Sequence, residues 1–373
     1  MWKIPLFKIY WDEDDIKSVT EAIRAGENWA VGPNIEEFEQ RIAEYVGTSF
    51  CVVFNSGTSA LHATLLAHGL KEGDEVIVPS FTFIATANAP LFVGAKPVFS
   101  DIEPETFGLS YEAVKEKITD KTKAILPIHF GGCPCKIEKM KELAEDHGLL
   151  LIEDAAEALG ADVGGKKAGT FGDSAMLSFC QNKIITTGDG GAVVTNSRGI
   201  YERLKLVRSH GRSETSNYFS STAYMDYITL GYNFRLSNIS AALGVAQLKK
   251  VDRLISMRRE NARYYDEKLK EIAEVETVKV PKRHHHVYQM YTVKVEHRDG
   301  LMKHLANKGI MSKVYFYPVH LTHFYKNVLG YKINLPVTER LASQVLTLPM
   351  YPHLSKEEMD IVVSEIKNFY QGI

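Results

Sequence analysis

Apolar runs alternate with amphipathic stretches through the first half of the chain. The apolar runs occupy residues 76–79, 97–99, 124–128 and 149–152, and amphipathic stretches lie between them at residues 111–118 and 135–147. Short apolar runs of this kind predict buried strands, and their alternation with helix-length segments predicts a mainly parallel sheet wrapped by helices. The fold class is therefore α/β.

A different pattern marks the C-terminal third. Residues 237–269 form a long, charge-rich amphipathic stretch, which predicts one or more helices leading into a second unit. We expect strands at residues 288–295 and 312–317, and helices at residues 299–308, 338–343 and 356–370. A chain of 373 residues is long enough for two domains. We place them at residues 1–245, a large domain, and 246–373, a smaller C-terminal α/β domain.

One lysine stands between an apolar run and a glycine-rich turn, in SFCQNKIITTGDGG at residues 178–191. Upstream, LLLIEDAAEALG places Asp154 just after an apolar run, at the end of a predicted buried strand. Pyridoxal phosphate needs an amine that holds its aldehyde as a Schiff base and a carboxylate that keeps its ring nitrogen protonated. Lys183 and Asp154 are candidates for these roles. Taken singly, a solvated lysine and a helix-capping aspartate explain them as well.

A candidate phosphate site lies earlier in the chain, in NSGTSALHATLLA at residues 55–67. Ser56, Gly57 and Thr58 stand where a helix is predicted to begin. Free backbone amides, hydroxyls and the positive end of the helix dipole favour an anion there. A plain N-cap explains the same residues. The segment is neither a P-loop nor a G-x-G-x-x-G turn, because it lacks their defining residues.

These segments, in this order and at these intervals, resemble the DegT-type sugar-nucleotide aminotransferases. That family has the aspartate-aminotransferase-like fold, fold type I of the pyridoxal-phosphate enzymes. The resemblance therefore implies a large domain with a mainly parallel seven-stranded sheet between helices. It covers nearly the whole chain and includes IPLFKIYWDEDDIKSV, VGPNIEEFEQRIAEYVG, GDEVIVPSFTFIATANAP, GYNFRLSNISAALGVAQLKKVD and YFYPVHL.

The resemblance implies roles around the cofactor ring. Lys183 resembles the Schiff-base lysine, Asp154 the partner of the ring nitrogen, and Phe83 the aromatic that stacks on the ring, although a core phenylalanine explains Phe83 equally well. Glu157 stands where many members have glutamine or histidine beside the ring oxygen, and a carboxylate there repels a phenolate unless a proton is shared. DAAEA together with NKIITT is similar to the branch that aminates C4 of 4-keto-6-deoxy sugars, such as the perosamine synthases.

The resemblance also implies phosphate ligands and a second subunit. Gly57, Thr58 and Ser178 resemble the residues that bind the phosphate, with Ser56 beside them. Asn233, in GYNFRLS, resembles an asparagine that reaches the phosphate of the neighbouring subunit's cofactor. We therefore expect a homodimer with shared active sites.

Substrate contacts are expected from residues in NWAVG, RSHGR and FYPVHL. Hydroxyls and diphosphates are bound by neutral donors and by cations, and these segments offer both. A surface or structural role remains open for each of the five candidates. They are Trp29, Arg208, His210, Tyr317 and His320.

The resemblance implies a ping-pong transamination. L-glutamate gives its amino group to the cofactor, which becomes pyridoxamine phosphate, and a nucleotide-linked 4-keto-6-deoxy sugar then receives it. Some relatives are dehydratases with a histidine in place of the lysine, so Lys183 argues against that chemistry. A 3-keto sugar or cyclitol substrate remains an alternative, as does a non-catalytic regulatory protein that binds pyridoxal phosphate.

Composition limits the other possibilities. A formal net charge of −2 gives no bulk attraction to nucleic acid or to an anionic membrane. No apolar run reaches the roughly 18 residues of a membrane helix, so we expect a cytoplasmic protein. Four cysteines are too few for a disulfide framework in a chain of this length. Residues 284–286 are histidines, but neighbours on a strand point to opposite faces, so we expect no metal site.

Overall fold

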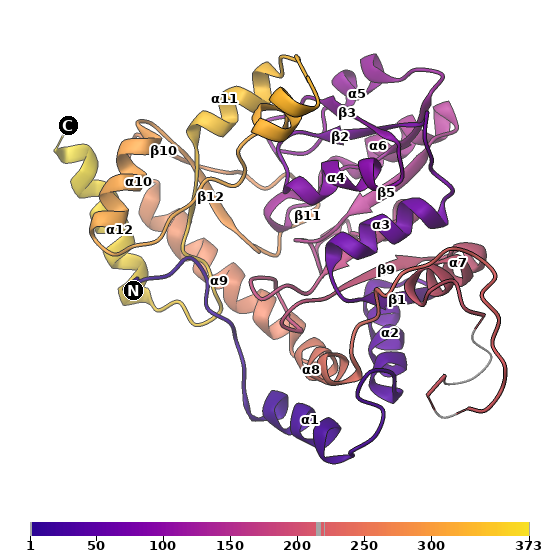
Figure 1. The fold of residues 1–373 in the computed structure, drawn as a ribbon. Coiled ribbons are helices and arrows are strands. Elements are labelled where there is room, and N and C mark those ends of the chain that lie inside the picture. The colour runs from indigo at the N-terminus through magenta and orange to yellow at the C-terminus, as the bar shows by residue number, and fades with distance from the viewer. Residues whose placement is uncertain (1, 214–217, 220, 373) are drawn as a thin grey trace.

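A seven-stranded sheet forms the centre of the computed structural model, which describes residues 2–213, 218–219 and 221–372 (Figure 1). The strand order is β1-β9-β8-β5-β4-β2-β3. The strands from β3 to β8 run parallel, and β9 lies antiparallel between β8 and β1. The expected α/β fold with a mainly parallel seven-stranded sheet is confirmed. The strands are β1 (Phe50–Phe54), β2 (Glu75–Pro79), β3 (Lys96–Ser100), β4 (Thr122–Ile125), β5 (Leu150–Asp154), β8 (Ser174–Ser178) and β9 (Gly191–Thr195).

Helices cover both faces of this sheet, which is why its strands read as continuous apolar runs. On β1, Val53 packs into one hydrophobic cluster with α2 and α8, while Val52 and Phe54 pack into another with α3, α4 and α7. Helices α5 and α6 cover the first of these faces beside β2, β4 and β5. The helices are α2 (Pro33–Val46), α3 (Gly57–Ala67), α4 (Ile84–Phe92), α5 (Tyr111–Lys117), α6 (Ile137–His147), α7 (Arg198–Arg208) and α8 (Asn238–Leu248).

The C-terminal unit lies beside the sheet unit, and α9 (Val251–Leu269) runs from one into the other (Figure 1). Its three-stranded sheet has the order β10-β12-β13, and a smaller sheet has the order β11-β6-β7. The remaining elements are β6 (Asp162–Val163), β7 (Lys166–Lys167), β10 (Val275–Thr277), β11 (His284–His285), β12 (Tyr291–Val295), β13 (Val345–Leu348), α10 (Arg298–Asn307), α11 (Pro336–Gln344), α12 (Lys356–Gln371) and short helical turns at Phe130–Gly132, Val319–Leu321 and Phe324–Val328.

The strand expected at residues 312–317 is wrong. Burial does alternate there, since Val314 and Phe316 are buried and Tyr317 is exposed. Only Lys313 pairs with another strand, through an isolated bridge to Thr347 on β13. Alternating burial therefore shows which side chains face the core. It does not by itself show that the backbone pairs with a neighbouring strand.

The packing of α9 bears on the division into domains. Val251 and Leu254 belong to the hydrophobic cluster of the sheet unit, whereas Ala262 and Tyr265 belong to that of the C-terminal unit. The start of the chain also packs with the C-terminal unit, because Ile4 lies in its core. These contacts favour a boundary within α9 rather than at residue 245, with the N-terminal segment added to the C-terminal unit.

The N-terminal segment crosses between the two units. Ile4 pairs with Ile310, and the carbonyl of Leu6 accepts a 3.0 Å hydrogen bond from the amide of Met350. The chain then passes to α1 (Glu13–Arg24), which packs against α8 (Figure 1). No helix among residues 2–213, 218–219 and 221–372 is long and apolar enough to cross a bilayer.

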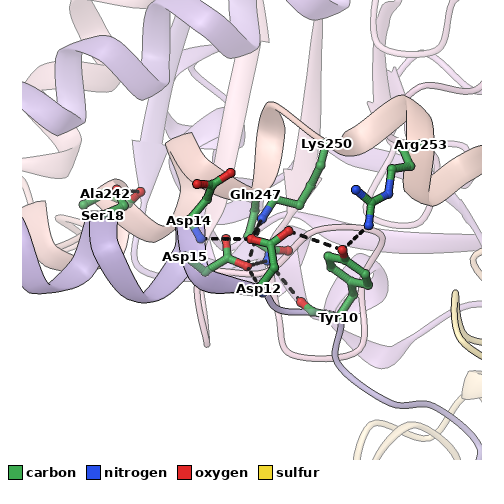
Figure 2. Close-up of polar contacts among 9 residues, drawn as sticks. All are labelled: Tyr10, Asp12, Asp14, Asp15, Ser18, Ala242, Gln247, Lys250 and Arg253. Carbon is green, nitrogen blue, oxygen red and sulfur yellow. Dashed lines mark hydrogen bonds and ion pairs between the residues drawn. The ribbon is translucent and has the colours of Figure 1, made fainter.

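A buried polar cluster fastens α1 to the end of α8 and the start of α9 (Figure 2). The ammonium of Lys250 lies 3.0 Å from Oδ2 of Asp15 and also contacts the carboxylate of Asp12. The side-chain amide of Gln247 donates to the same oxygen of Asp15 at 2.9 Å and to the carbonyl of Tyr10 at 3.1 Å. Asp12 is also the N-cap of α1, so the charges that begin this helix also hold it against its neighbours.

This cluster yields a prediction about stability. Replacing Lys250→Met should lower the free energy of unfolding by about 3 kcal/mol, because the buried carboxylate of Asp15 loses its counter-charge. The neighbouring Lys249 is exposed, so Lys249→Met should change the free energy of unfolding by less than about 0.5 kcal/mol. Chemical denaturation of the two variants measures the difference. Equal losses would show that the cluster contributes no more than a surface lysine does.

Candidate active site

Polar residues from separate segments meet at the carboxyl edge of the sheet. The register sets Phe54 of β1 opposite Gly191 of β9, and Gly191 opposite Ser178 of β8. Asp154 ends β5 and pairs with Met176 of β8. Parallel strands present their carboxyl ends at one edge, which is the usual ligand-binding edge of an open α/β sheet. The segments expected to bind one ligand are therefore neighbours.

Lys183 lies in the turn between β8 and β9, and its side chain is only 14% exposed. Its Nζ is 3.4 Å from Oε1 of Glu157. The other carboxylate oxygen of Glu157 accepts a 2.8 Å hydrogen bond from the amide of Gly131, and Glu157 is itself buried. Lys183 is thus a sheltered, paired amine rather than a solvated surface lysine.

Asp154 is buried and accepts two hydrogen bonds, 3.1 Å from the amide of Ala156 to Oδ1 and 2.7 Å from Oγ1 of Thr86 to Oδ2. Burial raises the pKa of Asp154 above its usual value, and the charge of Glu157 adds to this rise. Both hydrogen bonds and the charge of Lys183 oppose it, without cancelling it. A cation placed against Asp154, such as a protonated ring nitrogen, would stabilise its charged form.

The start of α3 presents free backbone amides, which is the arrangement that an anion-binding site requires. Ser56 is its N-cap and accepts from the amide of Ser59 at 3.1 Å, as the plain capping interpretation expects. The first amides of the helix, those of Gly57 and Thr58, have no acceptor within the helix. A Cβ on Gly57 would lie 3.3 Å from Oγ of Ser178, so glycine allows the helix start to approach β8.

A cavity of about 390 Å³ opens beside this helix start. Ser56, Thr58 and Asn233 are among the residues that line it. The carbonyl of Asn233 accepts from the side-chain amide of Asn55 of the same chain at 3.4 Å. Asn233 therefore lies beside the start of α3 of its own chain, and its expected contacts with the cofactor phosphate and with a neighbouring subunit stay predictions.

Phe83 is 58% exposed and forms the N-cap position of α4, four residues after the end of β2. A core phenylalanine would be buried, so that alternative is excluded. The exposed ring lies at the same edge of the sheet as Asp154 and Lys183. The candidate site thus combines an aromatic face, a buried acid, a sheltered amine and a helix start with free amides. These are the groups that a phosphorylated pyridine aldehyde requires.

Comparison with known proteins agrees with this reading. The sequence profile of the DegT/DnrJ/EryC1/StrS aminotransferase family matches residues 10–367. The chain belongs to this family. It is 40% identical to a GDP-perosamine synthase of Escherichia coli O157:H7, covering 91% of each chain, and 36% identical to one of Vibrio cholerae, covering 99% of this chain and 100% of that one.

Solved structures extend the comparison. A putative sugar aminotransferase from Streptococcus pneumoniae, solved in its PMP-form, superposes with a TM-score of 0.93 at 27% identity, covering 99% of this chain and all of that one. The same protein has also been solved in its PLP-form. The expected family, the fold type I architecture and the dependence on pyridoxal phosphate are confirmed. This member of the family is a pyridoxal-phosphate-dependent sugar aminotransferase.

Three of the five substrate candidates in this aminotransferase present accessible side chains. Trp29 is 51% exposed, Tyr317 is 60% exposed, and His210 lies on the surface with a positive φ of 63°. The backbone of Trp29 is anchored, because its carbonyl accepts from the amide of Asn238 at 2.9 Å. These three residues remain candidates for contacts with the sugar nucleotide.

Arg208 is used inside the fold. Its guanidinium pairs with the carboxylate of Glu39 and donates to the carbonyl of Val53 at 3.2 Å, while Glu39 accepts from the amide of Val53 at 2.8 Å. Val53 lies on β1, at the edge of the sheet, so this pair satisfies backbone groups that an edge strand leaves open. Arg208 therefore has a structural role, and its expected contact with the substrate stays a prediction.

His320 is also committed within the fold, and it is only 2% exposed. Its Nδ1 is 2.6 Å from the hydroxyl of Ser80, and its Nε2 is 3.2 Å from Glu339. The motif FYPVHL therefore offers Tyr317 to a ligand and keeps His320 as a link between β2 and α11. His320 leaves the substrate candidates for this reason.

The histidines at residues 284–286 serve structure as well. His284 and His285 pair with β6, and His286 is buried with its ring stacked 4.0 Å from that of Tyr288. Among the described residues, no group of three histidine, cysteine, aspartate or glutamate side chains is arranged to hold a metal.

The carboxylate that precedes Asp154 has partners that the sequence pattern does not predict. Glu153 is fully buried and accepts from Nε2 of His129 at 2.9 Å and from the amides of Gly169, Phe171 and Gly172, each at 2.8 Å. Burial opposes ionisation of Glu153, but these bonds outweigh it, so its pKa lies below the usual value. The alternation of a strand does indicate that a second buried carboxylate beside Asp154 needs its own donors, but it does not indicate which residues supply them.

Glu153→Gln tests this arrangement. A glutamine has one acceptor oxygen for four donors and directs its own N–H groups at backbone amides, so the free energy of unfolding should fall by about 3–5 kcal/mol. The wild-type carboxylate contributes its stability above the usual glutamate pKa and loses it as the pH falls through its lowered pKa. In the Glu153→Gln variant, the free energy of unfolding should not show this fall at acid pH. The exposed Glu138→Gln is the control, and an unchanged pH profile of unfolding in Glu153→Gln would contradict the prediction.

Proposed function

We propose that the protein transfers the amino group of L-glutamate to the C4 keto group of a nucleotide-linked 4-keto-6-deoxy sugar. The observation that carries the proposal is the sheltered Lys183, paired with Glu157 and electrostatically coupled to Asp154. Glu157 and Lys183 lie in DAAEA and NKIITT, the two segments that are similar to the C4-aminating branch. Two relatives named GDP-perosamine synthase, at 36% and 40% identity, support the same substrate class.

Each residue of the site has a role in this proposal. Pyridoxal phosphate, when bound, supplies a carbonyl that can carry nitrogen and a ring that withdraws electrons. Nζ of Lys183 holds the cofactor and takes the proton from Cα of glutamate, and Asp154 keeps a proton on the ring nitrogen. The amides of Gly57 and Thr58 bind the phosphate, with the hydroxyl of Ser178 beside them. Phe83 covers one face of the ring.

The proposal includes a homodimer whose active sites are shared. Large exposed apolar side chains gather close to Asn233 in the sequence, and Phe219, Tyr224 and Leu230 are 61%, 86% and 78% exposed. Apolar side chains exposed in one region often mark a protein interface. Asn233 would then reach across that interface to the neighbouring cofactor phosphate.

Mixing two inactive variants tests the shared site. If Lys183 and Asn233 serve one site from different subunits, a mixed dimer of Lys183→Ala and Asn233→Ala contains one site with both residues intact. Activity should then return after the subunits are exchanged, to at most about half of the wild-type value per mixed dimer. Two Lys183→Ala subunits provide the control. A mixture that stays inactive while affinity purification of differently tagged subunits shows mixed dimers would rule out sharing.

Lys183→Ala tests the catalytic assignment. Turnover with glutamate should fall by about 10³-fold or more, because the group that moves the proton is lost. Borohydride, which fixes a cofactor to a lysine amine, should no longer attach the cofactor to the chain. Lys205→Ala, on the partly exposed Lys205 side chain, should behave as wild type. Normal turnover in Lys183→Ala would refute the assignment.

A substrate panel separates the alternatives. Adding L-glutamate alone should shift the absorbance of the bound cofactor, whereas a purely regulatory binder would show no change. The aminated form is then offered 4-keto-6-deoxy and 3-keto sugars linked to GDP, UDP or dTDP, together with a cyclitol ketone. Product mass and NMR identify the aminated carbon. Amination at C3, or of the cyclitol alone, would refute the proposed substrate.

A further inference from the structure

Two buried threonines stand behind the carboxylate of Asp154. Thr82 precedes α4 and Thr86 lies in its first turn, and both are buried, with exposures of 1% and 0%. Oγ1 of Thr86 donates to Oδ2 of Asp154 at 2.7 Å, and the two threonine hydroxyls lie 2.7 Å apart. A hydroxyl chain therefore ends on the acid at the centre of the site.

The direction of the two hydrogen bonds that link Thr82, Thr86 and Asp154 is fixed. A threonine hydroxyl has one proton, and Thr86 gives its proton to the ionised carboxylate. The contact between the hydroxyls must then be donated by Thr82 and accepted by Thr86. A hydroxyl that accepts one bond is polarised and donates more strongly in the next. Thr82 thus strengthens the bond that Thr86 makes to Asp154.

The same turn of α4 carries the exposed aromatic ring. Phe83 occupies the N-cap position, and its carbonyl accepts from the amide of Thr86 at 3.2 Å. Phe83 faces outward with 58% exposure, whereas Thr86 faces inward and is fully buried. The first turn of α4 therefore fixes the position of the Phe83 ring relative to the Thr86 hydroxyl, which donates to Asp154.

We propose that Thr86 is a positioning residue that aims the carboxylate of Asp154 at the cofactor's ring nitrogen, with Thr82 fixing the direction of the Thr86 hydroxyl. Through α4 this contact aligns Asp154 with the ring face offered by Phe83. The inference rests on the cofactor roles proposed above for Asp154 and Phe83.

The electrostatics of the site explain why Asp154 needs such support. Burial and the charge of Glu157 both favour the neutral acid, while Thr86, the amide of Ala156 and the charge of Lys183 favour the carboxylate. The hydrogen bond from the backbone amide of Ala156 fixes only Oδ1 of Asp154. Without Thr86, Oδ2 loses its donor, and the acid both turns more freely and carries less negative charge.

The holoenzyme variant Thr86→Val, which keeps the shape and removes the donor, tests the inference. The half-reaction with L-glutamate should slow by about 10- to 100-fold, as expected when a hydrogen bond to a charged group is lost. The KM for glutamate should change much less than the rate, because Thr86 does not touch the substrate. Thr82→Val should slow the reaction in the same direction by a smaller factor, and Thr86→Ser, which restores a hydroxyl, should recover most of the rate.

Two readouts separate positioning from a merely structural role. With less negative charge on Asp154, the ring nitrogen holds its proton less firmly and withdraws fewer electrons from the rest of the cofactor. The pH at which half of the absorbance change of the bound cofactor has occurred should therefore rise in Thr86→Val. The cofactor should also dissociate more readily, which fluorescence of the released cofactor measures. The control is Thr64→Val, because Thr64 is equally buried and its hydroxyl donates only to the carbonyl of Ala60 at 2.8 Å. It should leave both readouts unchanged.

The outcomes are distinguishable from failure of the proposed function. If the wild type itself shows no absorbance change with glutamate, the proposed function fails. If the wild type reacts and Thr86→Val matches it in rate and in pH midpoint, the positioning role is overturned. If Thr86→Val does not fold, Thr82→Val decides, and a wild-type rate and midpoint in that variant overturn the inference.

Discussion

Two adjacent carboxylates at the end of β5 must both be accommodated in an interior that penalises charge. The alternation of a strand sends them to opposite sides, so each needs its own set of donors. Glu153 receives four, from His129 and three backbone amides, and joins β5 to the segment before β8. Asp154 accepts two hydrogen bonds. The charges of Glu157 and Lys183 also act on it. The structural acid is fully satisfied, whereas the acid of the site retains capacity for a ligand.

Much of this arrangement could be predicted from the sequence. Buried strands of a parallel sheet are continuous apolar runs, and their carboxyl ends meet at one edge, so Asp154, Lys183 and the helix start at Gly57 were expected to converge. Phe83 could not be assigned to the core or to the surface from its residue type alone. Its position at the N-cap of α4, where its side chain is exposed, decides the question.

The partners of the site residues were less predictable, because they come from distant parts of the chain. Thr86 is 68 residues from Asp154, and His129 is 24 residues from Glu153. Nothing in the local pattern indicates such pairs. Arg208 and His320 illustrate the same limit, since a cation and an imidazole in a suggestive motif serve equally well to bind substrate or to join elements. Only their tertiary neighbours, Glu39 and Glu339, distinguish the two uses.

The course of the N-terminal segment has a consequence for how the protein is made. Residue 4 pairs with residue 310, so the first strand-like contact of the chain must wait until most of the polypeptide has left the ribosome. Phe7 and Tyr10, on the same segment, line a small cavity together with Lys183. The wall beside Lys183 is therefore completed late in synthesis. A nascent chain that already contains Lys183, Asp154 and the start of α3 still lacks this wall of the candidate site.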